Sequence, residues 1–309
     1  MSVIPKFGLG TWKSPNNDVL VKAVTHAIEN ASYKHIDCAA CYENEDVVGK
    51  AFKDLFDDRK VVDRKDIWIT SKLWNTKHQP DLVEGACRET LRNLNLKYLD
   101  LYLMHYSIAF KPGDDYFPRD SNGKIILDPS NTGIVDTWLA MEQLVKKGLV
   151  KNIGVSNFTI NMLEVLKYDP RVSIRPYTNQ VEFHLYNQQN PLREYMAREG
   201  ILLTGYSVLG TNDWKKPNEP TVLEDKVLKE VASEVNVTPA AAEIQFLRQL
   251  APQATLLAKS VTPSRITDNI KQHCLLSQEQ VARLVARNRN YRFVNPKVNW
   301  GIDVLGDGW

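Results

Sequence analysis

Short apolar runs alternate with longer segments whose apolar residues recur at helical spacing along most of the chain. Residues 18–30, for example, place five apolar side chains on one helical face: Leu20, Ala23, Val24, Ala27 and Ile28. The short runs predict strands at residues 6–12, 34–39, 66–74, 98–105, 150–158, 175–184, 201–210 and 254–260. The longer segments predict helices at residues 18–30, 44–56, 80–94, 133–149, 159–168, 190–200, 223–248 and 263–271.

Strict alternation of strands and helices predicts a parallel sheet with crossover helices. Eight such units indicate a closed (β/α)₈ TIM barrel, with a doubly wound sheet as the alternative. No linker or low-complexity segment divides the chain, so we expect a single domain over residues 1–309. Residues 106–132 and 207–222 form long connections after strands, which places them at the C-terminal face, where barrel active sites lie. Residues 287–309 form a tail that we expect to lie over this face.

Composition and charge exclude several classes of protein. Apolar residues make up 43% of the chain, charged residues 25%, and the formal net charge is +2. These values are typical of a globular protein and do not suit a strongly basic nucleic-acid binder. No apolar stretch is long enough to span a membrane, and the start MSVIPKFGLGTW does not resemble a signal peptide. Four cysteines are too few for a disulfide framework, so we expect a cytoplasmic protein with reduced thiols and neither nucleic-acid nor membrane partners.

Three charged or titratable residues stand at the ends of largely apolar strands, namely Asp37, Lys72 and His105, and Tyr42 follows the second strand. Asp37 and Lys72 come from neighbouring strands at equivalent depth and can pair; a purely structural ion pair is the alternative. A nearby ammonium lowers the pKa of a phenol, and a neutral imidazole can orient a substrate oxygen. The four residues together predict a site that donates a proton to a carbonyl oxygen.

The spacing Cys38-Ala39-Ala40-Cys41 has three interpretations: a redox dithiol, half of a zinc site, or an accident. A redox dithiol usually opens a helix, whereas this pair lies at a strand-to-loop corner. A structural zinc site needs two further ligands, and Cys87 and Cys274 are isolated. We therefore expect the spacing to be accidental and no metal to be needed.

Over essentially its whole length the chain resembles the aldo-keto reductase family, in particular its aldose, aldehyde and xylose reductases. The matching stretches occur in the family's order and are GLGTWKSP, HIDCAACYENE, ITSKLWN, DLYLMH, GVSNF, NQVEFH, GYSVLG and KSVTPSRITDN. The resemblance implies a catalytic tetrad of Asp37, Tyr42, Lys72 and His105, with Tyr42 as general acid. It also implies a cytoplasmic monomer or weak homodimer that reduces aldehydes with NADPH, with aldoses as a candidate substrate class. A regulatory subunit that senses nicotinamide nucleotides without catalysis is the alternative.

The cofactor NADPH/NADP⁺ is expected on the C-terminal face, since no G-x-G-x-x-G follows a strand. By resemblance, Ser156, Asn157 and Gln180 hydrogen-bond the carboxamide and Tyr206 stacks on the nicotinamide. The other cofactor-binding residues implied by the resemblance are Gly10, Thr11 and Trp12 in the first strand, Ser207 and Leu209 along the pyrophosphate, Lys259, Ser260, Thr262 and Arg265 at the 2′-phosphate, and Asn269 at the adenine. The stretch KSVTPSR also combines two cations with hydroxyls at a helix start, which suits an anion; a solvated basic turn is the alternative.

The substrate pocket is expected among aromatic residues near the tetrad and in the tail. The candidates are Trp12, Trp74, His105, Tyr106, Phe117, Trp214 and Asn295. Tyr106 stands where many family members have a tryptophan, which predicts a wider and more polar wall. Each aromatic ring also has packing as an alternative role. Asn295 lies in an Arg-Phe-x-Asn-Pro stretch similar to the tail of sugar-reducing members, so it either contacts a hydroxylated substrate or is structural.

Overall fold

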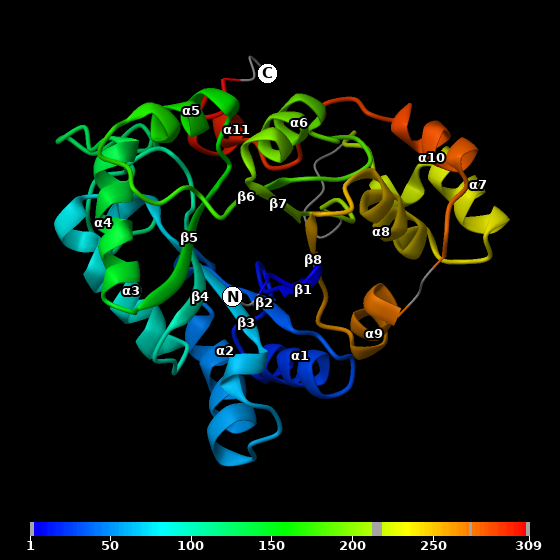
Figure 1. Cartoon of the computed structure of the whole chain (residues 1–309), viewed down its shortest axis with the longest axis horizontal. Coiled ribbons are helices and arrows are strands. Elements are labelled where there is room, and N and C mark those ends of the chain that lie inside the picture. Colours follow the sequence, from blue (N-terminus) through cyan, green and yellow to red (C-terminus); the bar gives the residue numbers. More distant parts are fainter. Residues whose placement is uncertain (1–2, 212–217, 272–273, 307–309) are drawn as a thin grey trace.

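The computed structural model describes residues 3–211, 218–271 and 274–306. Within these residues, eight parallel strands close into a barrel in the order of the chain, each paired with its neighbours and β1 with β8 (Figure 1). The (β/α)₈ prediction is confirmed. The strands are β1 (Phe7–Gly10), β2 (His35–Asp37), β3 (Trp68–Leu73), β4 (Leu99–Met104), β5 (Val150–Ser156), β6 (Thr178–Glu182), β7 (Leu202–Tyr206) and β8 (Thr255–Lys259).

Helices surround the ring of strands (Figure 1). Those that follow the strands are α1 (Asp18–Glu29), α2 (Glu45–Phe52), α3 (Pro80–Asn93), α4 (Ile134–Lys146), α5 (Ile160–Tyr168), α6 (Asn190–Glu199), α7 (Lys226–Glu234), α8 (Pro239–Leu250) and α9 (Pro263–Lys271). The C-terminal part adds α10 (Gln278–Val285) and α11 (Pro296–Trp300), which the apolar pattern did not predict.

The helical region predicted at 223–248, with Thr238 as a cap within it, contains two helices, α7 and α8. Between them Asn236 has a positive φ of 53°, a backbone conformation that ends a regular helix. The Thr238 side chain then accepts a hydrogen bond from the Ala241 N–H at 3.2 Å and caps α8, with Pro239 at its first position. The break is therefore encoded locally, although the apolar pattern runs across it.

Of the three apolar clusters among the described residues, two contain most of the buried side chains. The larger one lies between the strands and the surrounding helices, and it takes up the predicted inner face of α1, including Leu20 and Val24. The smaller one gathers Trp74, Tyr106, Phe110, Ile125, Trp300 and Val304 beside the ends of β3 and β4. Because Trp300 and Val304 belong to the tail, the small cluster joins the tail to the mouth of the barrel.

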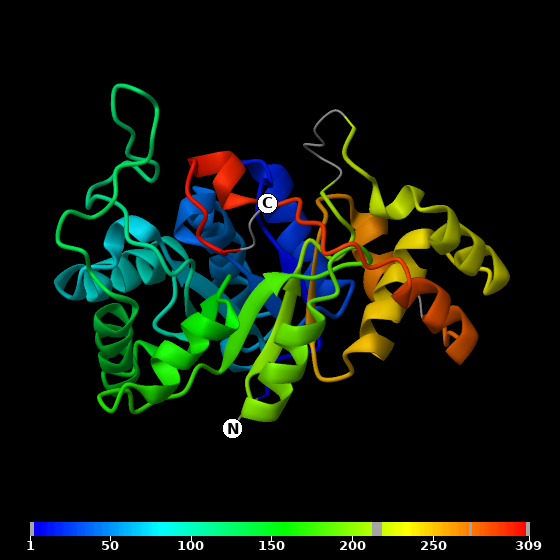
Figure 2. The same ribbon diagram turned by 90° about the horizontal axis from the view of Figure 1, so that it is seen from above.

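The long connection after β4 and the C-terminal tail lie on the same side of the barrel (Figure 2). Asp128 braces the connection by accepting hydrogen bonds from the Thr132 and Ser130 hydroxyls at 2.5 and 2.7 Å. Glu182, at the end of β6, holds the tail by accepting the backbone N–H groups of Phe293 and Val294 at 2.7 and 3.0 Å. Among the described residues, no helix is both long and apolar enough to cross a membrane.

Candidate active site

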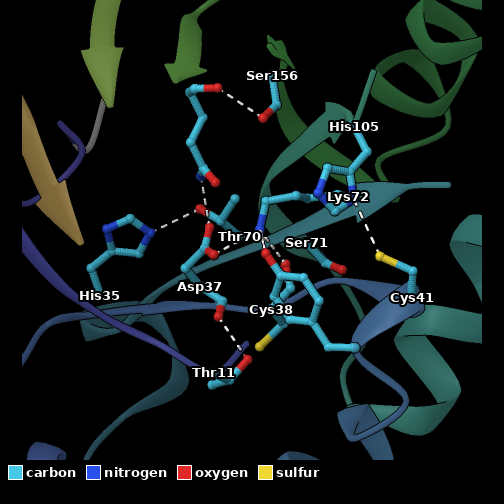
Figure 3. A network of polar contacts seen from close by, with 12 residues as sticks. Thr11, His35, Asp37, Cys38, Cys41, Thr70, Ser71, Lys72, His105 and Ser156 are labelled. Carbon is cyan, nitrogen blue, oxygen red and sulfur yellow. Dashed lines mark hydrogen bonds and ion pairs between the residues drawn. The ribbon is translucent and has the colours of Figure 1, made fainter. Parts of the chain in front are cut away.

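Lys72 lies at the centre of a buried polar network at the C-terminal ends of β2 and β3 (Figure 3). Its Nζ donates to Asp37 Oδ2 at 2.6 Å, to the Cys38 carbonyl oxygen at 2.8 Å and to the Tyr42 hydroxyl oxygen at 3.0 Å. An ammonium has three protons, and these three acceptors account for all of them. The predicted Asp37–Lys72 ion pair is present, and Tyr42 is its third member.

The pairing register of β2 and β3 does not set Asp37 directly opposite Lys72. Asp37 pairs in register with Thr70, so Lys72 stands two residues farther along β3. Strands in a closed barrel are staggered relative to their neighbours, and the pattern of apolar residues does not give the size of that stagger. Across this offset Lys72 Nζ reaches Asp37 Oδ2 at 2.6 Å.

Tyr42 closes a short 3₁₀ turn, Ala40–Tyr42, that follows β2. Burial raises the pKa of its hydroxyl well above the ordinary value, and the carboxylate of Asp37 raises it further. Desolvation of the phenolate therefore sets the direction of this shift. The hydroxyl stays protonated at neutral pH, as a proton donor must, and Lys72 faces the oxygen on which negative charge would develop.

His105 follows β4 and is 8% exposed. Burial, with a smaller contribution from Lys72, lowers its pKa well below the ordinary value, so the imidazole is neutral at neutral pH. Its ring stacks on Tyr106 at a centroid distance of 5.4 Å, and Trp74 meets it edge-on at 5.0 Å. The Tyr42 ring lies 5.9 Å away. A neutral imidazole beside a protonated phenol offers two hydrogen-bond donors to one oxygen atom.

A second chain of hydrogen bonds links the tetrad to residues predicted to hold a nicotinamide (Figure 3). Gln180 Nε2 donates to Asp37 Oδ1 at 2.8 Å, and Ser156 Oγ donates to the Gln180 carbonyl oxygen at 2.8 Å. Asn157 Nδ2 donates to the His105 carbonyl oxygen at 3.0 Å, and Tyr206 donates to Asn157 Oδ1 at 2.7 Å. The two carboxylate oxygens of Asp37 are thus occupied by different partners, Lys72 and Gln180. The residues predicted for catalysis and those predicted for cofactor binding form one contiguous network.

The remaining predicted cofactor residues line the ends of β1, β7 and β8. Lys259 ends β8 opposite Gly10 of β1, and the Thr11 hydroxyl donates to the Asp37 carbonyl oxygen at 2.9 Å. Ser207 has a φ of 51° and its carbonyl oxygen accepts from Gly210 N–H, which makes a tight turn that leads to Leu209.

Four of the predicted phosphate ligands gather where β8 passes into α9. Lys259 and Ser260 are partly exposed, Thr262 and Arg265 are exposed, and Asn269 is buried on the inner side of the helix. The Ser260 hydroxyl accepts from Thr262 N–H at 3.1 Å, so the loop is folded onto the helix start. Two cations, hydroxyls and a helix N-terminus are a donor set that fits a phosphate monoester.

The structure brings together only part of the predicted substrate pocket. Trp74 meets Tyr106 at 6.2 Å and Phe117 at 5.3 Å, so these three form one wall. Trp12 lies across the site, 6.4 Å from the Tyr42 ring. Asn295 caps α11, its Oδ1 accepting from Lys297 N–H at 2.9 Å, so that oxygen already has a structural partner. Trp214 lies outside the described residues.

Cys38 and Cys41 are not joined by a disulfide. Both are free thiols; Cys38 is fully buried and Cys41 partly so. Burial raises the pKa of each thiol, which opposes the thiolate that redox exchange and metal binding both need. Among the described residues, no group of three or more His, Cys, Asp or Glu side chains is placed to hold a metal ion.

Comparison with known proteins supplies the family. The sequence profile of the Aldo/keto reductase family matches residues 6–289. The chain belongs to the aldo/keto reductase family. It is 43% identical over 297 residues to human aldo-keto reductase family 1 member A1, and 44% identical to that of Sus scrofa, each covering 95% of this chain and 89% of the relative.

Two solved structures support the same assignment. An aldose reductase from Schistosoma japonicum superposes with a TM-score of 0.88 at 37% identity, covering 100% of this chain and 97% of its own. An aldose reductase from Giardia lamblia gives a TM-score of 0.87 at 36% identity, covering 97% and 98% of the two chains. This aldo/keto reductase is therefore an oxidoreductase, and its reaction class is carbonyl reduction.

Sequence reasoning missed two side chains of this aldo/keto reductase. Trp300, in α11, packs edge-on against Tyr106 at 4.7 Å and against Trp74 at 5.9 Å. Cys41 places its Sγ 3.6 Å from His105 Nδ1. An aromatic tail residue is a weak signal by itself, and the position of Cys41 next to Tyr42 was the only feature that could have drawn attention to its side chain.

Proposed function

We propose that this protein catalyses the NADPH-dependent reduction of aldehydes to alcohols, with aldoses among the candidate substrates. The observation that carries the proposal is the single ammonium of Lys72, which contacts both Asp37 and the Tyr42 hydroxyl. NADPH, when bound, supplies the hydride that goes to the carbonyl carbon. The residues of this chain bind the cofactor, orient the carbonyl and provide the proton.

Tyr42 is the proposed general acid. Its raised pKa keeps the phenol protonated until a carbonyl oxygen beside it gains negative charge. The proton then moves from the Tyr42 hydroxyl to that oxygen, and the Lys72 ammonium at 3.0 Å stabilises the phenolate left behind. Asp37 and the Cys38 carbonyl oxygen accept two protons of the Lys72 ammonium, so its third proton is directed at the Tyr42 oxygen.

His105 is proposed to orient the carbonyl through a ring N–H. A neutral imidazole can donate without carrying charge into the site, and burial lowers the pKa of His105 enough to keep it neutral. Tyr106 stacks on the ring and Trp74 meets it edge-on, and these two contacts fix its orientation. The oxygen is thus met by the Tyr42 hydroxyl and by one imidazole N–H.

NADPH is proposed over NADH because of the cations at the β8–α9 junction. Lys259 and Arg265 flank the site assigned to the 2′-phosphate, and the N-terminus of α9 adds donors to it. Ser156, Asn157 and Gln180 are assigned to the carboxamide and Tyr206 to the face of the nicotinamide ring. The cytoplasmic location and the monomeric or weakly dimeric state remain predictions from the sequence.

The test is NADPH oxidation by the purified protein across a panel of aldehydes, aldoses and ketones, with the Tyr42→Phe variant in parallel. We expect turnover of at least one carbonyl class and its loss in the variant. Binding of NADPH with no turnover of any carbonyl would instead favour the regulatory alternative, which no finding described above supports.

A further inference from the structure

The side chain of Cys41 faces the imidazole of His105 (Figure 3). Its Sγ lies 3.6 Å from Nδ1, which is within hydrogen-bonding range for sulfur. The turn that carries Cys41 is fixed by two backbone hydrogen bonds, from Tyr42 N–H to the Ala39 carbonyl oxygen and from Glu43 N–H to that of Ala40, both at 3.1 Å. The same short turn therefore presents both the proposed proton donor, Tyr42, and a thiol aimed at the second donor.

The other contacts of His105 fix its ring plane but do not distinguish its two nitrogens. Tyr106 stacks at an interplanar angle of 18°, and Trp74 and Tyr42 meet the ring edge-on. Asn157 contacts His105 at the backbone carbonyl oxygen and not at the ring. In a neutral imidazole, the position of the single proton is set by the hydrogen bond that the other nitrogen makes.

The proton state of both groups determines which of them donates. Burial lowers the pKa of the His105 imidazole and raises the pKa of the Cys41 thiol, so both are neutral at neutral pH. A thiol is a weak donor and a poor acceptor, whereas an unprotonated imidazole nitrogen is a good acceptor.

We propose that Cys41 is a positioning residue for His105: its S–H donates to Nδ1 and keeps the ring proton on Nε2, where it can meet a substrate carbonyl oxygen. The inference rests on the proposed function, in which His105 orients that oxygen. It gives Cys41 a role unrelated to the Cys-x-x-Cys spacing, because Cys38 takes no part in it. The contact is weak, so we expect a several-fold effect on turnover rather than its loss.

Three variants test the role. Cys41→Val replaces the thiol with a slightly larger apolar side chain and removes the donor. Cys41→Ser keeps a donor as an O–H group. Cys87→Val makes the same apolar replacement at a fully buried cysteine in α3. We expect Cys41→Val to lower kcat by about three- to tenfold with the NADPH Kd unchanged. Cys41→Ser should stay within about twofold of wild type, and Cys87→Val should match wild type in kcat.

A readout independent of turnover is the tautomer of His105, measured by ¹⁵N NMR of histidine-labelled protein and assigned with a His105→Asn variant. We expect the Nε2–H form in wild type and in Cys41→Ser, and a mixture with the Nδ1–H form in Cys41→Val. An unchanged tautomer in Cys41→Val, or a serine variant as impaired as the valine variant, would overturn the proposal. If wild type reduces no carbonyl, the proposed function fails, while the tautomer experiment still reports on the Cys41–His105 contact.

Discussion

The hydroxyl oxygen of Tyr42 lies 3.0 Å from Nζ of Lys72, an ammonium that is itself completely buried. A buried ammonium is stable only when its protons are taken up, and here Asp37 and the Cys38 carbonyl oxygen accept the other two. The direction of the third proton is consequently fixed. The Tyr42 oxygen accepts it, so the phenolic proton must point elsewhere, toward the open side of the site.

Tyr42→Phe should remove the proton donor while keeping the ring. General acid catalysis is typically worth about 10²- to 10⁴-fold, so we expect kcat to fall by at least about 10²-fold with the NADPH Kd nearly unchanged. Steady-state kinetics and fluorescence titration measure the two quantities. Tyr168→Phe, at a tyrosine 69% exposed on α5, is the matched control and should behave as wild type. Activity of Tyr42→Phe within a factor of a few of wild type would contradict the assignment.

Lys72→Met should abolish turnover and also destabilise the fold. Asp37 would keep its Gln180 contact but lose its counter-ion, and leaving one partner of a buried pair alone typically costs about 3–5 kcal/mol. The double variant Asp37→Asn/Lys72→Met removes both charges and should recover much of that stability without recovering activity. Urea unfolding of the single and double variants measures the difference. Equal stability of the two would mean that the ion pair is not what stabilises this part of the barrel.

Sequence alone predicted the barrel because its information is local and repeated. Each β/α unit carries its own apolar period, and eight of them leave few topologies open. The ends of neighbouring strands also meet at one face of such a barrel, which is why Asp37, Lys72 and His105 could be grouped. Register could not be predicted, since the two-residue offset between Asp37 and Lys72 depends on the stagger of the closed sheet.

Features that depend on tertiary packing were not predictable in this way. The raised pKa of Tyr42 follows from burial by segments distant in the chain, whereas the sequence showed only a nearby lysine. Trp300 acquires its role by packing on Trp74 and Tyr106, and Glu182 binds the backbone of the tail at Phe293. Cys41 faces His105 because of the turn geometry after β2, which no periodicity encodes.

Arg265→Ala should weaken NADPH binding selectively. A charge-assisted hydrogen bond contributes about 1.5–3 kcal/mol, which corresponds to about one to two orders of magnitude in Kd. NADH lacks the 2′-phosphate, so its Kd should change much less. The preference for NADPH over NADH should therefore become smaller. Lys271→Ala, at the other end of α9, is the matched control. An unchanged ratio of the two dissociation constants, measured by fluorescence titration, would place the 2′-phosphate elsewhere.

Glu182→Gln should loosen the C-terminal tail. An amide has one acceptor oxygen, so one of the N–H groups of Phe293 and Val294 would face an NH₂ group instead of a carboxylate oxygen. We expect faster hydrogen exchange in a peptide that covers residues 287–300 and a higher KM, because Trp300 would pack less firmly on Trp74. Glu279→Gln, at an exposed carboxylate in α10, should leave exchange in that peptide unchanged. Exchange that is equally slow in Glu182→Gln would show that the other contacts of the tail are enough to hold it.

Glu243 makes the stability of the fold depend on pH, and replacement of its carboxyl by the amide of glutamine should remove this contribution. Its side chain is fully buried in α8, Leu185 N–H donates to Oε1 at 2.7 Å, and burial raises its pKa to about 8. In the unfolded chain a glutamate titrates near its ordinary value, about 4.3. Between these two pKa values the folded state holds a proton that the unfolded state has lost, so rising pH costs stability there.

Glu243→Gln has no proton to lose, and its Oε1 can still accept from Leu185. The stability of the variant relative to wild type should therefore increase from pH 5 to pH 8, by up to about 1.4 kcal/mol per pH unit, and level off above about pH 8. Urea unfolding of both proteins at pH 5, 6, 7, 8 and 9 measures this slope. Glu279 is exposed, so Glu279→Gln should run parallel to wild type over the same range. A parallel profile for Glu243→Gln as well would mean that the carboxyl ionises in the folded protein as easily as it does in water.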